Sequence, residues 1–165
     1  NNEPDMDAPW AYHYVGRPDR TAEIVHAAVH QTFGPGAGGL PGNDDSGGLS
    51  SWYVWASLGL FPVAGHGVVM LNAPSWRSAR LAVANGTLDV ATVGFREGLQ
   101  YVQAATLDGV PHHRAWLTSE ELHRGGRLEL ALGDQPSDWG TSELPPSASS
   151  APHQRRTEDP CPAGS

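Results

Sequence analysis

The sequence predicts an α+β fold, in which helices come first, a small antiparallel β-sheet follows and a disordered C-terminal tail ends the chain. Apolar residues recur at helical spacing through roughly the first third of the 165 residues. After Pro62 the pattern changes to short β-rich runs, separated by turn dipeptides such as Asn85-Gly86. The chain therefore divides into residues 1–63, 64–141 and 142–165.

Two helices are expected at the start, over Met6–Tyr14 and Pro18–Phe33. Gly16 lies between them, and a proline such as Pro18 suits the first turn of a helix because its missing N–H has no partner there. In the second helix the apolar residues follow steps of three and four, which predicts one buried face and one polar face. That apolar stripe consists of Ile24, Val25, Ala28, Val29 and Phe33.

A segment rich in Gly and Pro follows over residues 34–48 and cannot continue a helix or a strand. A third helix is predicted from about Leu49 to Leu60, with Gly59 and Pro62 marking its end. This helix is apolar on nearly every side, which predicts burial between more helices than the chain supplies. We therefore expect the chain to be a piece of a larger helical domain.

Short strands are predicted in the second part of the chain, at the spacing of hairpins. They are Val68–Leu71, Arg80–Val83, Thr87–Val93, Tyr101–Thr106, Ala115–Leu117 and Leu128–Leu132. This spacing predicts one small antiparallel sheet. From Ser142 onward Leu144 is the one sizeable aliphatic residue, so the tail cannot bury enough surface to offset its ordering entropy.

Composition excludes several classes of function. The longest apolar stretch, Trp52–Val63, is about 12 residues, well short of the roughly 20 that a membrane span requires. The 18 acidic residues outnumber the 10 basic ones, for a formal charge of -8, so nucleic acid is not an expected partner. A single cysteine, Cys161, excludes a disulfide framework, and the absence of lysine excludes a P-loop.

Two acidic clusters are the candidate sites of chemistry. Asn2-Glu3-Pro4-Asp5 precedes the first predicted helix, and Asn43-Asp44-Asp45 precedes the third. A helix N-terminus favours the charged form of a carboxylate, which suits a base or a metal ligand. The alternative is that these residues are helix caps. Oxygen-rich side chains also suit calcium, but the EF-hand pattern is absent, so its ligands would come from distant segments.

Two histidines and several aromatic residues allow other interpretations. His26 and His30 have the spacing of two zinc ligands on a helix, although the general-base Glu of zinc hydrolases is missing. A zinc hydrolase is one alternative, and a pair of groove or surface histidines is the other. Trp52 and Trp55 are assigned to the core, whereas Trp10 is a candidate for stacking on a sugar ring.

Several sequence blocks, taken together and in order, resemble the C-terminal part of the exo-α-mannosidases of glycoside hydrolase family 92. The resemblance runs from about Asn2 to Thr141. The blocks are NEPDMDAPWAYHYVGRP, PGNDDSGGLSSWYVWASLGLFPV, YVQAATLDG, AWL, GGRLEL and DWGTS.

This resemblance implies a calcium-dependent, inverting enzyme that removes terminal α-mannose, with α-1,2 linkages expected, from mannose-containing glycans. Such a protein pairs an N-terminal β-sandwich with an (α/α)6 catalytic barrel. Residues 1–63 would be the last helices of that barrel, and residues 64–141 its closing β-rich segment. The sandwich and the rest of the barrel are expected upstream, in a parent protein that is secreted or on the surface of a bacterium.

The resemblance also implies roles for the acidic residues. Asp45 matches the family's general base, and Asp44 lies beside it in the catalytic loop. The residues expected to bind mannose are Asn2, Glu3, Asp5 and Asn43, of which Glu3 and Asn43 are also expected to reach calcium. The family's general acid lies upstream of these blocks, so the isolated chain is expected to be inactive. A non-catalytic remnant or a carbohydrate-binding module is the alternative from a different class.

Overall fold

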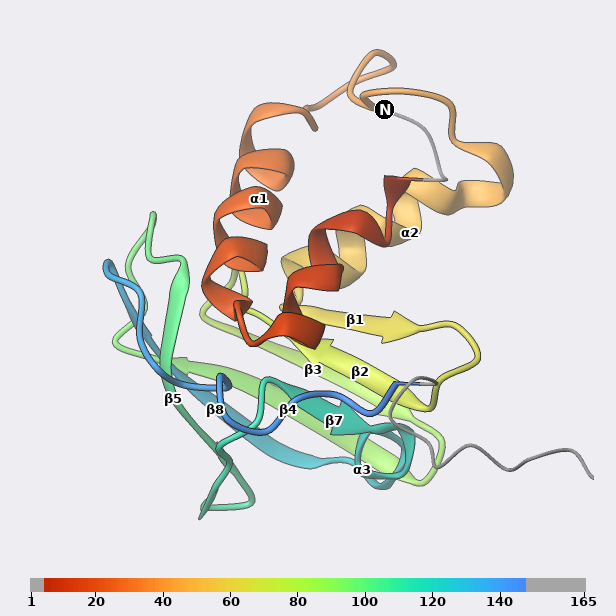
Figure 1. Ribbon diagram of the computed structural model, residues 1–165. Helices are drawn as coiled ribbons and strands as arrows, with labels where there is room; N and C mark the ends of the chain where they lie inside the picture. Colours follow the sequence, from red (N-terminus) through yellow and green to blue (C-terminus); the bar gives the residue numbers. More distant parts are fainter. Residues whose placement is uncertain (1–4, 148–165) are drawn as a thin grey trace, which may run out of the picture.

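A computed structural model of the chain describes residues 5–147 (Figure 1). It combines helices with β-sheets, so the predicted α+β class is confirmed. The helices are η2 (Ala8–Val15, a 3-10 helix), α1 (Pro18–Gln31), η3 (Asp45–Gly47, a 3-10 turn), α2 (Gly48–Ser57) and α3 (Ser119–Arg124). The strands are β1 (Leu60–Val63), β2 (Val68–Leu71), β3 (Ser78–Val83), β4 (Gly86–Val93), β5 (Tyr101–Leu107), β6 (Val110–Pro111), β7 (Trp116–Thr118) and β8 (Gly126–Gly133).

The elements form three layers, in which a small sheet lies between the helices and a larger sheet (Figure 1). The small sheet has the order β1-β2-β7 and is antiparallel. The larger sheet has the order β3-β4-β8-β5-β6, and its β4 and β8 are parallel. The prediction of one antiparallel sheet is therefore wrong, because turn dipeptides mark reversals of the chain and do not specify which distant strands pair.

Strand β2 lies at the centre of the fold, and all four of its residues are buried. Successive side chains on a strand point to opposite faces. Val69 and Leu71 pack into the cluster formed with the larger sheet, whereas Val68 and Met70 pack into the cluster formed with the helices. A strand covered on both faces requires a continuous apolar run, which is the pattern that the sequence has here.

Helix α2 ends at Ser57 rather than at the predicted Leu60. Gly59 adopts a φ of 73°, and a Cβ on it would lie 2.5 Å from the main-chain oxygen of Asn72. This turn directs the chain into β1, which the sequence did not predict. The predicted burial of α2 on nearly every side is not found within residues 5–147, where the Val54 side chain is 54% exposed. No helix in that range has the length and apolarity to cross a membrane.

The other differences concern short elements and the tail. Strand β6 and helix α3 were not predicted, although each of the six predicted strands overlaps an observed one. Residues 142–147, predicted to begin the disordered tail, form coil that contacts the fold. There the Trp116 Nε1–H donates to the main-chain oxygen of Glu143 at 3.1 Å, and Pro145 is buried. Residues 148–165 lie outside the described part of the chain.

Candidate active site

The first acidic cluster ends at a groove in the helical layer, which the segment before the second cluster also reaches. Asp5, the one residue of its cluster that the structure describes, lines a groove of about 390 Å3 together with Met6 and Trp52. Pro41, from the glycine-rich segment just before Asn43, lines the same groove. The structure therefore places one end of the first cluster at a groove between η2, α1 and α2, and no residue of the second cluster lines that groove. Asn2 and Glu3 lie outside the described residues.

A hydrogen bond connects the segment after the first cluster to α2. The Trp52 Nε1–H donates to the main-chain oxygen of Met6 at 3.0 Å, across 46 positions of sequence. In Figure 1 the red start of the helical segment accordingly lies beside α2. Trp52 is 6% exposed and stacks on Phe33 with ring centroids 5.8 Å apart. The prediction that Trp52 belongs to the core is confirmed.

Asp44 contacts the first turn of α2. The main-chain N–H of Ser50 donates to Oδ1 of Asp44 at 2.9 Å, and the Ser50 hydroxyl donates to Oδ2 at 2.5 Å. These two hydrogen bonds hold the pKa of the Asp44 carboxyl below its ordinary value, and the bond from the Ser50 hydroxyl has the larger effect. Asp44 is therefore ionised at neutral pH with both oxygens engaged. This contact fits the helix-cap interpretation for Asp44.

Asp45 lies in a tight turn between Asp44 and α2. Ser46 adopts left-handed backbone angles (φ 54°, ψ 22°), and Gly47 follows with a φ of 76°. A side chain other than Gly, Asn or Asp is uncommon in that region, and such backbone strain gathers at functional sites. The side chains of Asp45 and Asn43 are both exposed, on either side of Asp44. The turn thus separates Asp45 from the helix end that Asp44 caps.

The glycine-rich segment closes on itself before it reaches the acidic residues. The Gly34 N–H donates to the Gly39 oxygen at 2.8 Å, and the Gly39 N–H donates to the Gly36 oxygen at 3.0 Å. A Cβ at Gly39 would lie 1.8 Å from the Gly34 oxygen, so glycine is required at that position. The segment is therefore neither helix nor strand, as predicted, and main-chain bonds within it close the loop.

The described residues do not form a calcium site by themselves. Within residues 5–147 no group of three His, Cys, Asp or Glu side chains could hold a metal ion. Calcium takes about six to eight oxygen ligands, including carboxylates, amide oxygens and waters. Asn43 is exposed and offers one amide oxygen, whereas both carboxylate oxygens of Asp44 accept hydrogen bonds from Ser50. The donor set is thus too small in this part of the chain.

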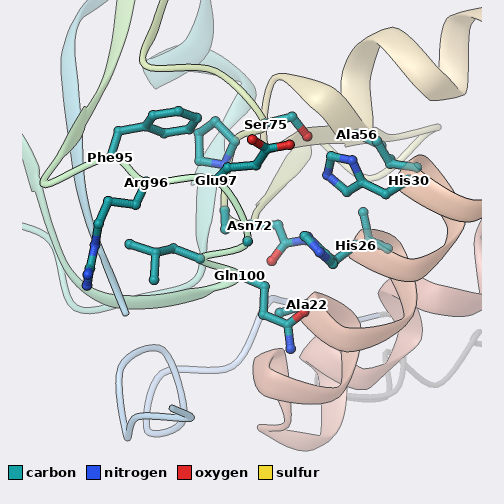
Figure 2. Close-up of a pocket in the computed structure, with 16 residues that line it drawn as sticks. Ala22, His26, His30, Ala56, Asn72, Ser75, Phe95, Arg96, Glu97 and Gln100 are labelled. Atoms are coloured by element: carbon teal, nitrogen blue, oxygen red, sulfur yellow. The ribbon is translucent and has the colours of Figure 1, made fainter. Parts of the chain in front are cut away.

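The predicted histidine pair lines a different pocket, of about 40 Å3, between α1 and the loop that joins β4 to β5 (Figure 2). The ring centroids of His26 and His30 are 4.4 Å apart. Burial, and then the neighbouring His30, lowers the pKa of His26. Glu97 lines the same pocket, but these side chains form no three-membered metal group in the range that the structure covers. The zinc alternative therefore has no third ligand there.

Trp10 is not available to stack on a sugar. It is 1% exposed, and its ring stacks on Phe61 with centroids 4.8 Å apart. Sequence reasoning also missed His13, which is buried and whose Nε2–H donates to the main-chain oxygen of Leu71 at 3.0 Å. His13 thereby connects η2 to β2. An amphipathic pattern that repeats through η2 would have assigned both side chains to the buried face, but η2 is too short to show one.

Comparison with known proteins gives consistent results. The model of the glycosyl hydrolase family 92 catalytic domain matches residues 1–134. An uncharacterized secreted glycosidase of Arthroderma benhamiae is 39% identical over 152 residues, which make up 88% of this chain and 20% of that protein. The chain therefore spans about a fifth of the length of this relative.

Two solved structures from Bacteroides thetaiotaomicron are similar in fold. A family GH92 inverting mannosidase has a TM-score of 0.77 at 29% identity, over 85% of this chain and 19% of that one. A family GH92 α-mannosidase in complex with mannoimidazole has a TM-score of 0.83 at 23% identity, over 89% of this chain and 20% of that one. At that identity the second likeness shows the fold alone. Together with the family model, which matches most of its length, these findings show that the chain belongs to glycosyl hydrolase family 92.

Proposed function

We propose that the complete gene product that contains this chain is an inverting exo-α-mannosidase, and that this chain supplies its general base. The observation that carries the proposal comes from a chain of a glycoside hydrolase family. Asp5, the described end of one acidic cluster, lines a groove beside α2, and Asp44 of the other cluster contacts the first turn of the same helix. The name of the similar solved protein at 29% identity, an inverting mannosidase, supports the same reaction.

The proposed chemistry uses Asp45 as the base. In an inverting glycosidase a carboxylate takes a proton from a water on one face of the sugar, while a carboxylic acid protonates the leaving oxygen on the other face. The two groups are typically about 6.5 to 9.5 Å apart, which leaves room for the water. We assign the water to Asp45, because Asp45 matches the general base of the family in the resemblance of the sequence blocks. The acid would come from residues outside this chain.

We propose a mannose-containing glycan as the substrate, with an α-1,2 linkage at its end. Asn43 and Asp5 lie at the described ends of the two clusters and would bind sugar hydroxyls, together with Asn2 and Glu3. The relative from Arthroderma benhamiae is named a secreted glycosidase, which supports a secreted or cell-surface protein here. A bacterial source and the (α/α)6 barrel stay predictions from the family resemblance.

Calcium dependence is also proposed. Calcium would polarise sugar hydroxyls as a hard Lewis acid, and Glu3 and Asn43 are the ligands that we assign to it from this chain. Because the described residues offer too few oxygen ligands, the remaining ones would come from other parts of the gene product and from the substrate.

The proposal is tested by NMR of the first product that the complete gene product releases from an α-mannoside. An inverting reaction releases β-mannose, which then equilibrates to the mixture of anomers. Release of α-mannose first would contradict inversion. Binding of mannose without hydrolysis, detected as thermal stabilisation, would instead favour the alternative of a carbohydrate-binding module.

A further inference from the structure

We infer that Trp52 is a positioning residue for hydrolysis, which holds the segment that carries Asp5 in a fixed place relative to Asp44 and Asp45. This inference rests on the proposed function. Its basis is the hydrogen bond from the Trp52 Nε1–H to the main-chain oxygen of Met6, at 3.0 Å. Met6 directly follows Asp5, so a displacement of Met6 displaces the end of the first acidic cluster as well.

The start of α2 contacts Asp44 of the second cluster and Met6, the residue that follows the first cluster. Ser50 donates two hydrogen bonds to Asp44, and Trp52, two residues later, donates one to Met6. Residues two apart on an α-helix are separated by about 200° around its axis, so these contacts leave the helix on different sides. The first turns of α2 therefore connect the segment that carries Asp5 to the loop that carries Asp44.

Trp52 is itself held in a single place. Its side chain is 6% exposed and stacks on Phe33, which also contacts the ring of Tyr53 with centroids 4.9 Å apart. The indole N–H is a donor only, and a buried donor without a partner is unfavourable, so burial of Trp52 favours its bond to Met6. A buried side chain that stacks on one neighbour and donates a hydrogen bond to another can hold the second neighbour in a fixed place.

The expected consequence is a kinetic one. Displacement of a catalytic or substrate-binding group by about 1 Å can cost roughly 10²-fold in rate. The segment that begins with Asp5 is joined to α2 by this bond from a residue 46 positions away, whereas Asp44 is joined to the same helix by local bonds. Loss of the Trp52 bond should therefore move one cluster and leave the other in place.

The test compares Trp52→Phe with Trp116→Phe in the complete gene product. Trp116 is a matched control, because it is 8% exposed and its Nε1–H also donates to a main-chain oxygen, that of Glu143, at 3.1 Å. Trp116 and Glu143 are not among the residues that line the groove beside Asp5. We expect Trp52→Phe to lower kcat about tenfold or more, with a smaller change in KM, and Trp116→Phe to keep kcat near that of the unsubstituted protein.

Hydrogen exchange gives a second readout that does not depend on activity. The amides of residues 5–9 should exchange faster in Trp52→Phe and remain unchanged in Trp116→Phe. If Trp52→Phe does not fold, benzothienylalanine at position 52 keeps the bicyclic ring and removes the donor, and the same two results are expected from it.

Three outcomes would overturn the inference: an unchanged kcat in the Trp52 variants, an equal loss of kcat in the Trp116 variant, or unchanged exchange over residues 5–9. An unsubstituted protein without mannosidase activity is a separate result, since it contradicts the proposed function itself. An active protein whose Trp52 variants keep full kcat contradicts the positioning role alone.

Discussion

Asp44 and Asp45 are neighbours in the sequence but differ in what surrounds them. Asp44 accepts two bonds from Ser50, at the start of α2, whereas Asp45 lies exposed in the strained turn that follows. A general base must reach a water beside the substrate, which a carboxylate with both oxygens engaged by its own helix does poorly. We therefore propose that Asp44 stabilises the start of α2, and the family resemblance assigns the role of base to Asp45.

Substitution of the two residues tests that separation. Asp45→Asn in the complete gene product is expected to lower kcat about 10²-fold or more, because it removes the positioned proton acceptor, and to leave the melting temperature near its original value. Asp44→Asn should reduce kcat less and lower the melting temperature, since it weakens the bonds from Ser50. Steady-state kinetics and thermal unfolding measure both. Equal kinetic losses would mean that the base has been assigned to the wrong residue.

His13 predicts a dependence of stability on pH. Burial lowers the pKa of its imidazole from 6.5 to about 4, against the opposing effect of its main-chain bond to Leu71. The folded state therefore keeps the ring neutral, while the unfolded state takes up a proton below pH 6.5. Stability should thus fall as the pH decreases from about 6.5 to about 4, by up to about 3 kcal/mol for this one group.

The variant His13→Gln measures this contribution. It carries no titrating group at position 13, so its unfolding free energy should change less with pH than that of the unsubstituted protein over the same interval. Denaturant unfolding at pH 7, 5.5 and 4 gives the comparison. Parallel pH profiles for the two proteins would show that another group is responsible.

At the same scale, the sequence marks candidate residues for the chemistry but not what holds them. The acidic clusters are recognisable because carboxylates and amides concentrate in short segments, the second of them beside glycines. The contact from Trp52 to Met6 spans 46 positions, so it depends on how distant segments pack and no local pattern indicates it. Trp52 was assigned to the core from its apolar surroundings. Its indole N–H also donates to the main-chain oxygen of Met6, and both residues line the groove.

The elements show where local pattern determines structure and where it does not. Val68–Leu71 was predicted with its observed bounds, since a continuous apolar run suits a strand buried on both faces. Helix α3 was missed although Thr118 and Glu121 form a capping box, a signal readable in the sequence as T-x-x-E. The parallel pairing of β4 with β8 could not be predicted, because it joins strands that are not consecutive.

The glycine-rich loop gives a prediction for a whole element. Gly39→Ala would place a methyl group 1.8 Å from the Gly34 oxygen, so the loop that precedes Asn43 must open. We expect a loss of about 1 to 2 kcal/mol in stability and a severalfold lower kcat. Gly38→Ala is the matched control, because a Cβ there meets no atom within 4 Å. Similar effects of the two substitutions would show that the closed form of the loop is not required.

For the whole molecule, the calcium proposal predicts a response to chelation. Treatment of the complete gene product with EDTA should abolish mannosidase activity, and added calcium should restore it, because ligands from several segments would have to meet at one cation. Magnesium, which prefers a smaller octahedral site, should restore less. Full activity in the presence of EDTA would contradict calcium dependence and leave the assignment of Asp45 unaffected.

The last prediction concerns how stability is distributed when the 165 residues are studied alone. The helical layer carries the apolar groove and exposed side chains such as Val54 and Val15, whereas β2 is buried between two hydrophobic clusters. Regions with fewer buried contacts open at lower free energy. Amides of α1 and α2 should therefore exchange faster than those of β2 and β8, with binding of a hydrophobic dye and no hydrolysis of mannosides. Equal protection of helices and sheets, with no dye binding, would show that the helical layer is stable without further partners.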